Sequence, residues 1–176
     1  MEGSRGLGDV YKRQSQFGLQ IKLMKVDFYF SYRSPYSYLI LPRVIDLKQN
    51  HNIDIEFKLV YPLAIRQPEF FNGKNFLTFF SHKMIDMRRV AKRLGMPFYT
   101  PKPDPIQQSY LTGKIDAHQP YIFDLCHLGQ QAHNEGVGLE LAYELSRLVF
   151  GTKKGWNETS NLENCLLYTS PSPRDP

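Results

Sequence analysis

Cysteine is scarce in this chain of 176 residues, which contains only Cys126 and Cys165. We assign Cys165 to a terminal segment that is not native protein, for the reason given below. Cys126 then stands alone, so a disulfide framework is excluded and a reducing cytoplasm is the expected location. Its helical spacing from Ile122 and Leu125 predicts a thiol packed in the core.

Several other features are absent, and each absence excludes a class of protein. No apolar run approaches the roughly 18 residues of a membrane span, and no segment resembles a signal peptide. No glycine-rich phosphate loop is present, and Cys126, His127 and His133 lack the paired spacing of a zinc site. The net charge of +5 comes with Lys and Arg scattered along a helical stretch, HKMIDMRRVAKR, which is typical of a solvated face. We therefore expect no membrane, nucleic-acid or metal partner.

The two ends of the chain show an unusual relation at the level of DNA. The head is SRGLGDVYKRQ (Ser4–Gln14) and the tail is CLLYTSPSPRD (Cys165–Asp175). Codons can be chosen that make one the reverse complement of the other, as in translated adapter ends of a transposon-based sequencing library. We interpret residues 1–14 and 165–176 as a non-native head and tail. The sequence does not decide whether residues 15–23 are native, and the intervening chain is expected to be an interior fragment of a longer parent.

A strand, a helix and a second strand are predicted near the start. Val26–Phe30 alternates apolar and polar residues, as a strand does. Ser34 stands where a helix N-cap belongs, and Pro35 stands at the first helical position. The helix is expected to end near Gln49, and residues 52–60 alternate again. Two strands joined through a helix predict a parallel βαβ unit.

Helical patterns dominate the rest of the chain. Residues 76–94, 120–135 and 138–150 repeat apolar positions at helical spacing. Two parallel strands alone do not bury both faces of a sheet, so the remaining strands are expected beyond Asn164. Without them, an exposed sheet edge and a bare apolar face are predicted, which is an aggregation liability.

Five segments carry a resemblance to a known family. They are VDFYFSYRSPYSYLILPRV, VYPLAIRQPEFF, LGMPF, PKPDPI and ELSRLVF…GW, in this order. Over Met24–Asn164 they resemble the 2-hydroxychromene-2-carboxylate isomerase family, which is related to kappa-class glutathione transferases and periplasmic disulfide oxidoreductases. The resemblance implies an α/β, thioredoxin-like fold. Its βαβ part would occupy residues 24–66 and an all-helical insertion residues 67–164, with the C-terminal half of the thioredoxin domain missing.

The turn SPYS, which begins at Ser34, has two interpretations. Ser34 can serve only as a helix cap, satisfying an otherwise unpaired N–H. Alternatively it faces a thiol supplied by a ligand. The related oxidoreductases have C-x-x-C at this turn, and here the spacing remains without the sulfurs. A hydroxyl at a helix N-terminus can donate a hydrogen bond to an external sulfur, and the helix dipole favours the thiolate.

The resemblance implies that glutathione is this thiol and acts as a recycled cofactor. The implied reaction is the cis–trans isomerisation of a small aromatic enone acid, with Ser34 as the catalytic residue that stabilises the thiolate. Arg33 and Tyr36 flank the turn and can contact an acidic ligand, although Tyr36 can equally be a packing aromatic and Lys74 a solvated loop residue. The implied glutathione-binding residues are Ser34, Arg33, Pro35, Tyr36, Asn72, Lys74 and Asn75.

Two other functions remain open. The first is a kappa-like glutathione transferase or peroxidase, which would consume glutathione instead of recycling it. Tyr36 and PKPDPI resemble the isomerase branch more closely. The second is that the polypeptide is an inactive fragment of its fold. The intact parent is a candidate homodimer. Outside the proposed site, Asp104 stands between two prolines and is expected to shape a turn.

Overall fold

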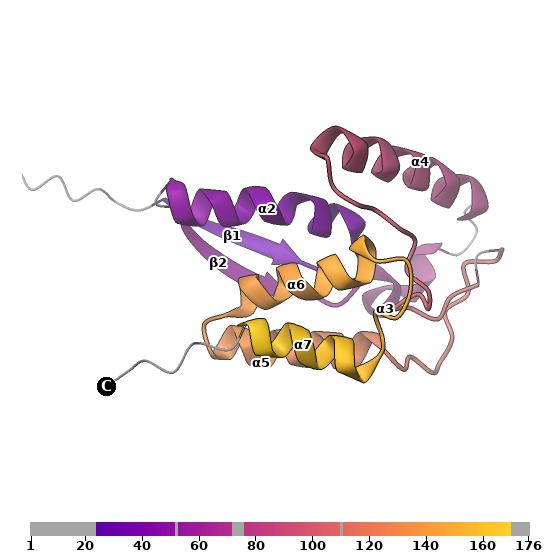
Figure 1. Ribbon diagram of the computed structural model, residues 1–176. Coiled ribbons are helices and arrows are strands. Elements are labelled where there is room, and N and C mark those ends of the chain that lie inside the picture. The colour runs from indigo at the N-terminus through magenta and orange to yellow at the C-terminus, as the bar shows by residue number, and fades with distance from the viewer. Residues whose placement is uncertain (1–23, 52, 72–75, 110, 170–176) are drawn as a thin grey trace, which may run out of the picture.

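The structure, a computed structural model, describes residues 24–51, 53–71, 76–109 and 111–169 (Figure 1). The predicted head lies outside these residues, as do Asn72, Lys74 and Asn75. The elements, in chain order, are β1 (Lys25–Phe30), α2 (Pro35–Asn50), β2 (Asp54–Leu59), α3 (Leu63–Arg66), the 3₁₀ helix η1 (Pro68–Phe71), α4 (Phe76–Leu94), α5 (Ile122–Asn134), α6 (Gly138–Gly151) and α7 (Thr159–Thr169).

The predicted βαβ unit is confirmed. Strands β1 and β2 pair in parallel, from Lys25 opposite Asp54 to Phe30 opposite Leu59. Helix α2 begins at Pro35, and the side chain of Ser34 caps it. The alternation of apolar residues produces the strands, and the Ser-Pro pair sets the point at which the chain turns into the helix.

The apolar face of the sheet is covered within this chain, contrary to the bare face that we expected. Residues paired across parallel strands lie on the same face, so one face collects the apolar positions. On that face only Val26 is exposed, and its exposed fraction is 38%. The ring of Phe57 lies 5.8 Å from that of His133 on α5, measured between centroids. The apolar side chains that join the core are Phe28, Phe30, Ile55, Phe57 and Leu59.

The opposite face of the sheet is polar, so it can remain in contact with solvent without a packing partner. Lys25 pairs with Glu56 at 3.0 Å and Lys58 with Asp27 at 2.9 Å, and all four side chains remain solvent-accessible. Such exposed pairs contribute little stability, but they make a solvated face compatible with folding. In the described part of the chain the sheet has two strands, so each pairs on one side only.

The predicted helices occur with small shifts at their ends. Helix α4 has the bounds expected from its pattern, and α5 and α6 differ from the predictions by one or two residues. Helix α6 packs against α2, α5 and α7, whereas α4 packs mainly against α2 and stands apart from the stack (Figure 1). One core joins residues of both predicted parts, such as Phe30 and Leu41 with Ala91, Leu141 and Leu145.

Helix α7 crosses the predicted start of the non-native tail. It runs from Thr159 to Thr169, and the side chain of Cys165 is only 8% exposed within it. The exclusion of Cys165 from fold reasoning therefore missed a core contact, because an apolar spacing with Leu162 and Leu166 suffices to extend and bury a helix. The origin of the tail remains a prediction.

Cys126 is a core residue, as predicted, and is only 3% exposed. Burial raises the pKa of its thiol to about 12, so it is uncharged at neutral pH and a poor nucleophile. In the described ranges no group of three or more His, Cys, Asp or Glu side chains is arranged to hold a metal ion. None of the described helices combines the length and apolar composition needed to cross a bilayer.

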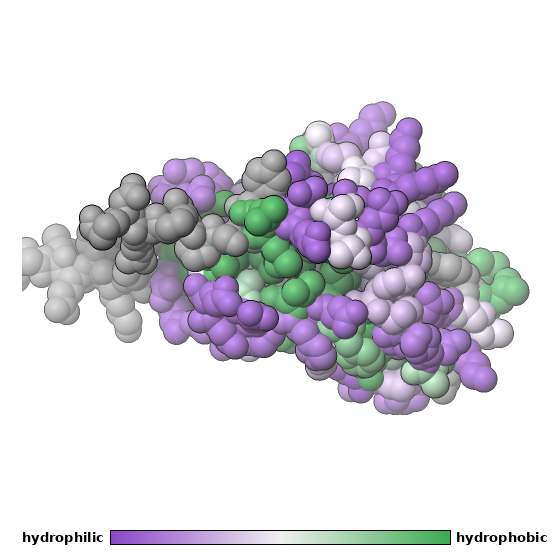
Figure 2. Space-filling model, turned by 60° about the horizontal axis from the view of Figure 1, so that its bottom comes forward, coloured by the Kyte–Doolittle hydropathy of each residue, from purple (hydrophilic) through white to green (hydrophobic). Residues whose placement is uncertain are grey.

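Figure 2 shows the face on the side of α5 and α7, where apolar residues gather in the middle between polar flanks. These two helices carry exposed large apolar side chains, including Phe123 at 38% and Leu167 at 74% exposure.

Candidate active site

A cleft of about 370 Å³ opens beside the N-terminus of α2. Its lining comes from the turn before α2, the segment from Val60 to Arg66, the inner side of α4, and the segment between α4 and α5, residues 95–121, here called the connector. Small-molecule sites commonly have volumes of about 300–1,000 Å³ and mostly apolar walls. The cleft therefore has the size and character of a ligand site.

Ser34 lines this cleft at the start of α2. Its Oγ accepts a hydrogen bond from the N–H of Ser37 at 3.3 Å, and its carbonyl accepts one from Tyr38 at 3.2 Å. A hydroxyl has one hydrogen to donate besides its two lone pairs. Among the described residues, none accepts that hydrogen. The two interpretations of Ser34 are thus compatible, since capping uses a lone pair and leaves the donor available.

The first turn of α2 carries no acidic side chain that would balance the positive end of the helix dipole. Pro35 has no N–H, and the N–H of Tyr36 has no acceptor in the described part of the chain. The positive end of the helix dipole and this free N–H therefore both act on whatever occupies the cleft next to Ser34.

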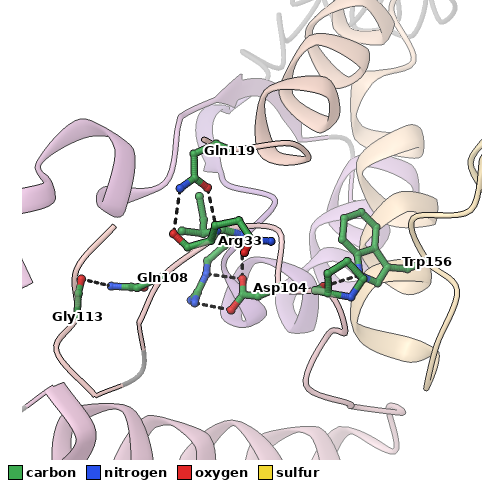
Figure 3. Close-up of polar contacts among 9 residues, drawn as sticks. Arg33, Asp104, Gln108, Gly113, Gln119 and Trp156 are labelled. Atoms are coloured by element: carbon green, nitrogen blue, oxygen red, sulfur yellow. Dashed lines mark hydrogen bonds and ion pairs between the residues drawn. The ribbon is translucent and has the colours of Figure 1, made fainter. Parts of the chain in front are cut away.

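Arg33 is bound to Asp104 of the connector. Its Nε donates to Oδ1 at 3.1 Å and its Nη2 donates to Oδ2 at 2.8 Å, in the bidentate geometry visible in Figure 3. The side chains are only 22% and 14% exposed, respectively. Oδ1 also accepts from the N–H of Ile106 at 3.0 Å, which is the predicted turn at Asp104. Arg33 lines the cleft, but Asp104 already neutralises its charge.

Buried polar contacts fix the connector in place (Figure 3). The side-chain amide of Gln119 accepts from the N–H of Gln107 at 2.9 Å and donates to its carbonyl at 3.0 Å. The indole N–H of Trp156 donates to the carbonyl of Pro103 at 2.7 Å, and Trp156 is 2% exposed. These bonds hold Asp104 where it meets Arg33. The connector, which lies outside the βαβ unit, therefore stabilises the turn before Ser34.

Tyr36 links the start of α2 to α4. Its hydroxyl donates a short hydrogen bond to Oδ2 of Asp86. Partial burial, together with this bond, raises the pKa of Tyr36 to about 12, so the phenol remains protonated at neutral pH. Tyr36 lines the cleft, yet its hydroxyl is engaged, so it borders the site as an aromatic wall.

Among the described residues, four charged side chains line the cleft: Arg33, Arg66, Lys83 and Asp104. Arg33 and Asp104 neutralise one another, which leaves an excess of positive charge. The Nε of Arg66 donates to the carbonyl of Tyr61 at 2.8 Å. Lys83 has its Nζ 4.5 Å from the centroid of the Phe79 ring, within cation–π range. An anionic ligand with an apolar body suits this lining.

Four of the predicted site residues meet at the cleft. They are Arg33, Ser34, Pro35 and Tyr36, whereas Asn72, Lys74 and Asn75 lie outside the described residues. Sequence reasoning did not identify Lys83 or the partners of Arg33 and Tyr36. The helical pattern of α4 was the one available signal for Lys83, because it placed a lysine beside the apolar positions Phe79 and Met84.

We expect Asp104→Asn to destabilise the protein by about 1–3 kcal/mol, because it removes the charge that compensates a largely buried Arg33. The asparagine can still accept from the N–H of Ile106, so the turn itself should persist. Asp116→Asn is the matched control, since Asp116 makes the same turn bond to His118 at 2.9 Å and is exposed. Urea unfolding of both variants checks this, and equal stabilities would contradict it.

Comparison with known proteins gives an informative likeness at the level of the fold. No protein-family model and no curated protein matches it. Its fold is similar to that of a solved structure of selenomethionine 2-hydroxychromene-2-carboxylate isomerase, with a TM-score of 0.58 and 20% sequence identity. The match covers 81% of this chain and 66% of the isomerase chain, just under two thirds of its length. The likeness confirms the predicted fold class: an α/β fold in which a thioredoxin-like βαβ unit is followed by helices.

Proposed function

We propose that the protein is a glutathione-dependent cis–trans isomerase of aromatic enone acids, like the isomerase whose fold it shares. The observation that carries the proposal is the position of Ser34. Its Oγ caps α2 through a lone pair, while its hydrogen is available at the cleft wall next to an uncompensated helix N-terminus. This combination would stabilise a sulfur anion brought in by a ligand, because the hydroxyl of Ser34, the N–H of Tyr36 and the positive end of the helix dipole all lie at the start of α2.

The residues present fit glutathione, a peptide with a thiol and two carboxylates. The cleft volume is in the range of small-ligand sites, and its lining carries an excess of positive charge. Neither Cys126, which is buried, nor any other cysteine lines the cleft. The sulfur chemistry at Ser34 therefore requires a thiol from a ligand.

When bound, glutathione would supply a thiolate that forms a C–S bond as the conjugated double bond becomes single, and that leaves again after rotation about this bond, unchanged. Ser34 would donate its hydroxyl hydrogen to the sulfur and keep it ionised. The N–H of Tyr36 would be the second donor. The Arg33–Asp104 pair would hold the turn so that both donors point at one place, and the apolar walls would exclude water.

A kappa-like glutathione transferase is the second candidate, because the same thiolate site serves conjugation. The two reactions differ in the fate of the thiol. We expect incubation of the chain with glutathione and an aromatic enone acid to change the absorption spectrum of the acid without loss of free thiol. Loss of thiol in proportion to product would favour the transferase. No reaction of either kind would contradict both and favour the inactive fragment.

A further inference from the structure

Lys83 occupies a special position on α4. It lines the cleft together with Ser34 and Tyr36, and it also borders the adjoining groove formed by Tyr36 and α4. Its Nζ lies over the ring of Phe79, which lines the same two hollows. Lys83 and Phe79 therefore stand between the two hollows, with the ammonium group against an aromatic ring.

No carboxylate within the described residues forms an ion pair with Lys83. The other cations of the cleft are already engaged in part: Arg33 is bound to Asp104, and the Nε of Arg66 is bound to a backbone carbonyl. Desolvation by its surroundings lowers the pKa of Lys83, and the nearby charge of Arg33 lowers it further. A cation that loses hydration without gaining an ion pair is stabilised by a bound anion.

We propose that Lys83 is the residue that determines specificity for the carboxylate of the aromatic substrate, with the Phe79 side of α4 as the wall for its ring. The identity of the acid rests on the proposed function, whereas the preference for a carboxylate rests on the charges of the cleft. From the sequence, Arg33 and Tyr36 were the residues expected to contact an acidic ligand. The structure favours Lys83, because Asp104 binds the Nε/Nη2 edge of the Arg33 guanidinium and neutralises its charge.

The test uses binding, so that it does not depend on turnover. Isothermal titration of the 176-residue chain with cinnamate and with cinnamamide compares an aromatic acid with an uncharged analogue of the same shape. We expect wild type to bind cinnamate about tenfold or more tightly than cinnamamide, as one charge-assisted contact implies. Lys83→Met should lose this preference through weaker cinnamate binding alone, and Lys83→Arg should keep most of it.

Lys92→Met is the matched control, because Lys92 is an exposed lysine in the last turn of the same helix and does not line the cleft. It should bind both compounds as wild type does. If Lys83→Met weakens the binding of both compounds equally, the proposal is overturned. It is also overturned if the wild type binds neither compound or binds both equally well. A wild type that discriminates but does not isomerise overturns the proposed function and supports the carboxylate site.

Discussion

Replacing Ser34 by alanine is expected to reduce glutathione-dependent turnover by about 10²–10³-fold, the usual cost of removing a donor that stabilises a developing or bound anion. The same substitution removes the cap of α2, which costs about 1 kcal/mol of stability. Steady-state rates, with glutathione affinity measured by titration, separate the two effects. Unchanged affinity and turnover in Ser34→Ala would refute the assigned role.

Two further variants separate capping from catalysis. Ser34→Asp keeps a side-chain acceptor for the N–H of Ser37, so stability should be close to wild type. The carboxylate introduced by Ser34→Asp repels a thiolate and has no proton to donate at neutral pH. Turnover should therefore fall as far as in Ser34→Ala. Ser37→Ala is the matched serine control, because Ser37 does not line the cleft. It should retain turnover within about twofold of wild type, the scatter expected for a neutral change.

Gly129→Ala is expected to destabilise the protein by about 1–3 kcal/mol, although alanine is the better helix former by about 1 kcal/mol. A Cβ on Gly129 would lie 2.6 Å from Cε2 of Tyr32 and still nearer its hydroxyl oxygen. Tyr32 is fully buried at 0% exposure, so its ring has no space into which to move. Chemical denaturation measures the effect, and a net stabilisation would show that the ring does yield.

The controls for Gly129→Ala test its two opposing contributions, which are the gain in helix propensity and the clash with Tyr32. Gln130→Ala, at an exposed position of the same helix, changes helix propensity without a core contact and should alter stability by less than about 0.5 kcal/mol. Tyr32→Phe removes a buried hydroxyl that has no hydrogen-bond partner in the described part of the chain. Because a buried unpaired hydroxyl is unfavourable, Tyr32→Phe should be neutral or stabilising.

The local elements of this protein follow from its sequence. Alternation specifies β1 and β2, Ser34 and Pro35 specify the start of α2, and the apolar spacing of α4 specifies its bounds. These features depend on residues within a turn or two of each other, so the local sequence is sufficient to specify them. The thiolate-binding hypothesis for Ser34 combined this local pattern with the family resemblance of the SPYS turn.

Only the tertiary structure decided what surrounds Ser34. Arg33 meets Asp104 across 71 positions of sequence, and Tyr36 meets Asp86 across 50. The burial of the apolar face of the sheet and the approach of Lys83 to the cleft likewise depend on how helices pack. Partners separated so widely leave no local periodicity, because their proximity results from burying a shared core. The sequence by itself therefore determined the strands, the helices and the cap, whereas packing determined the charges and walls of the site.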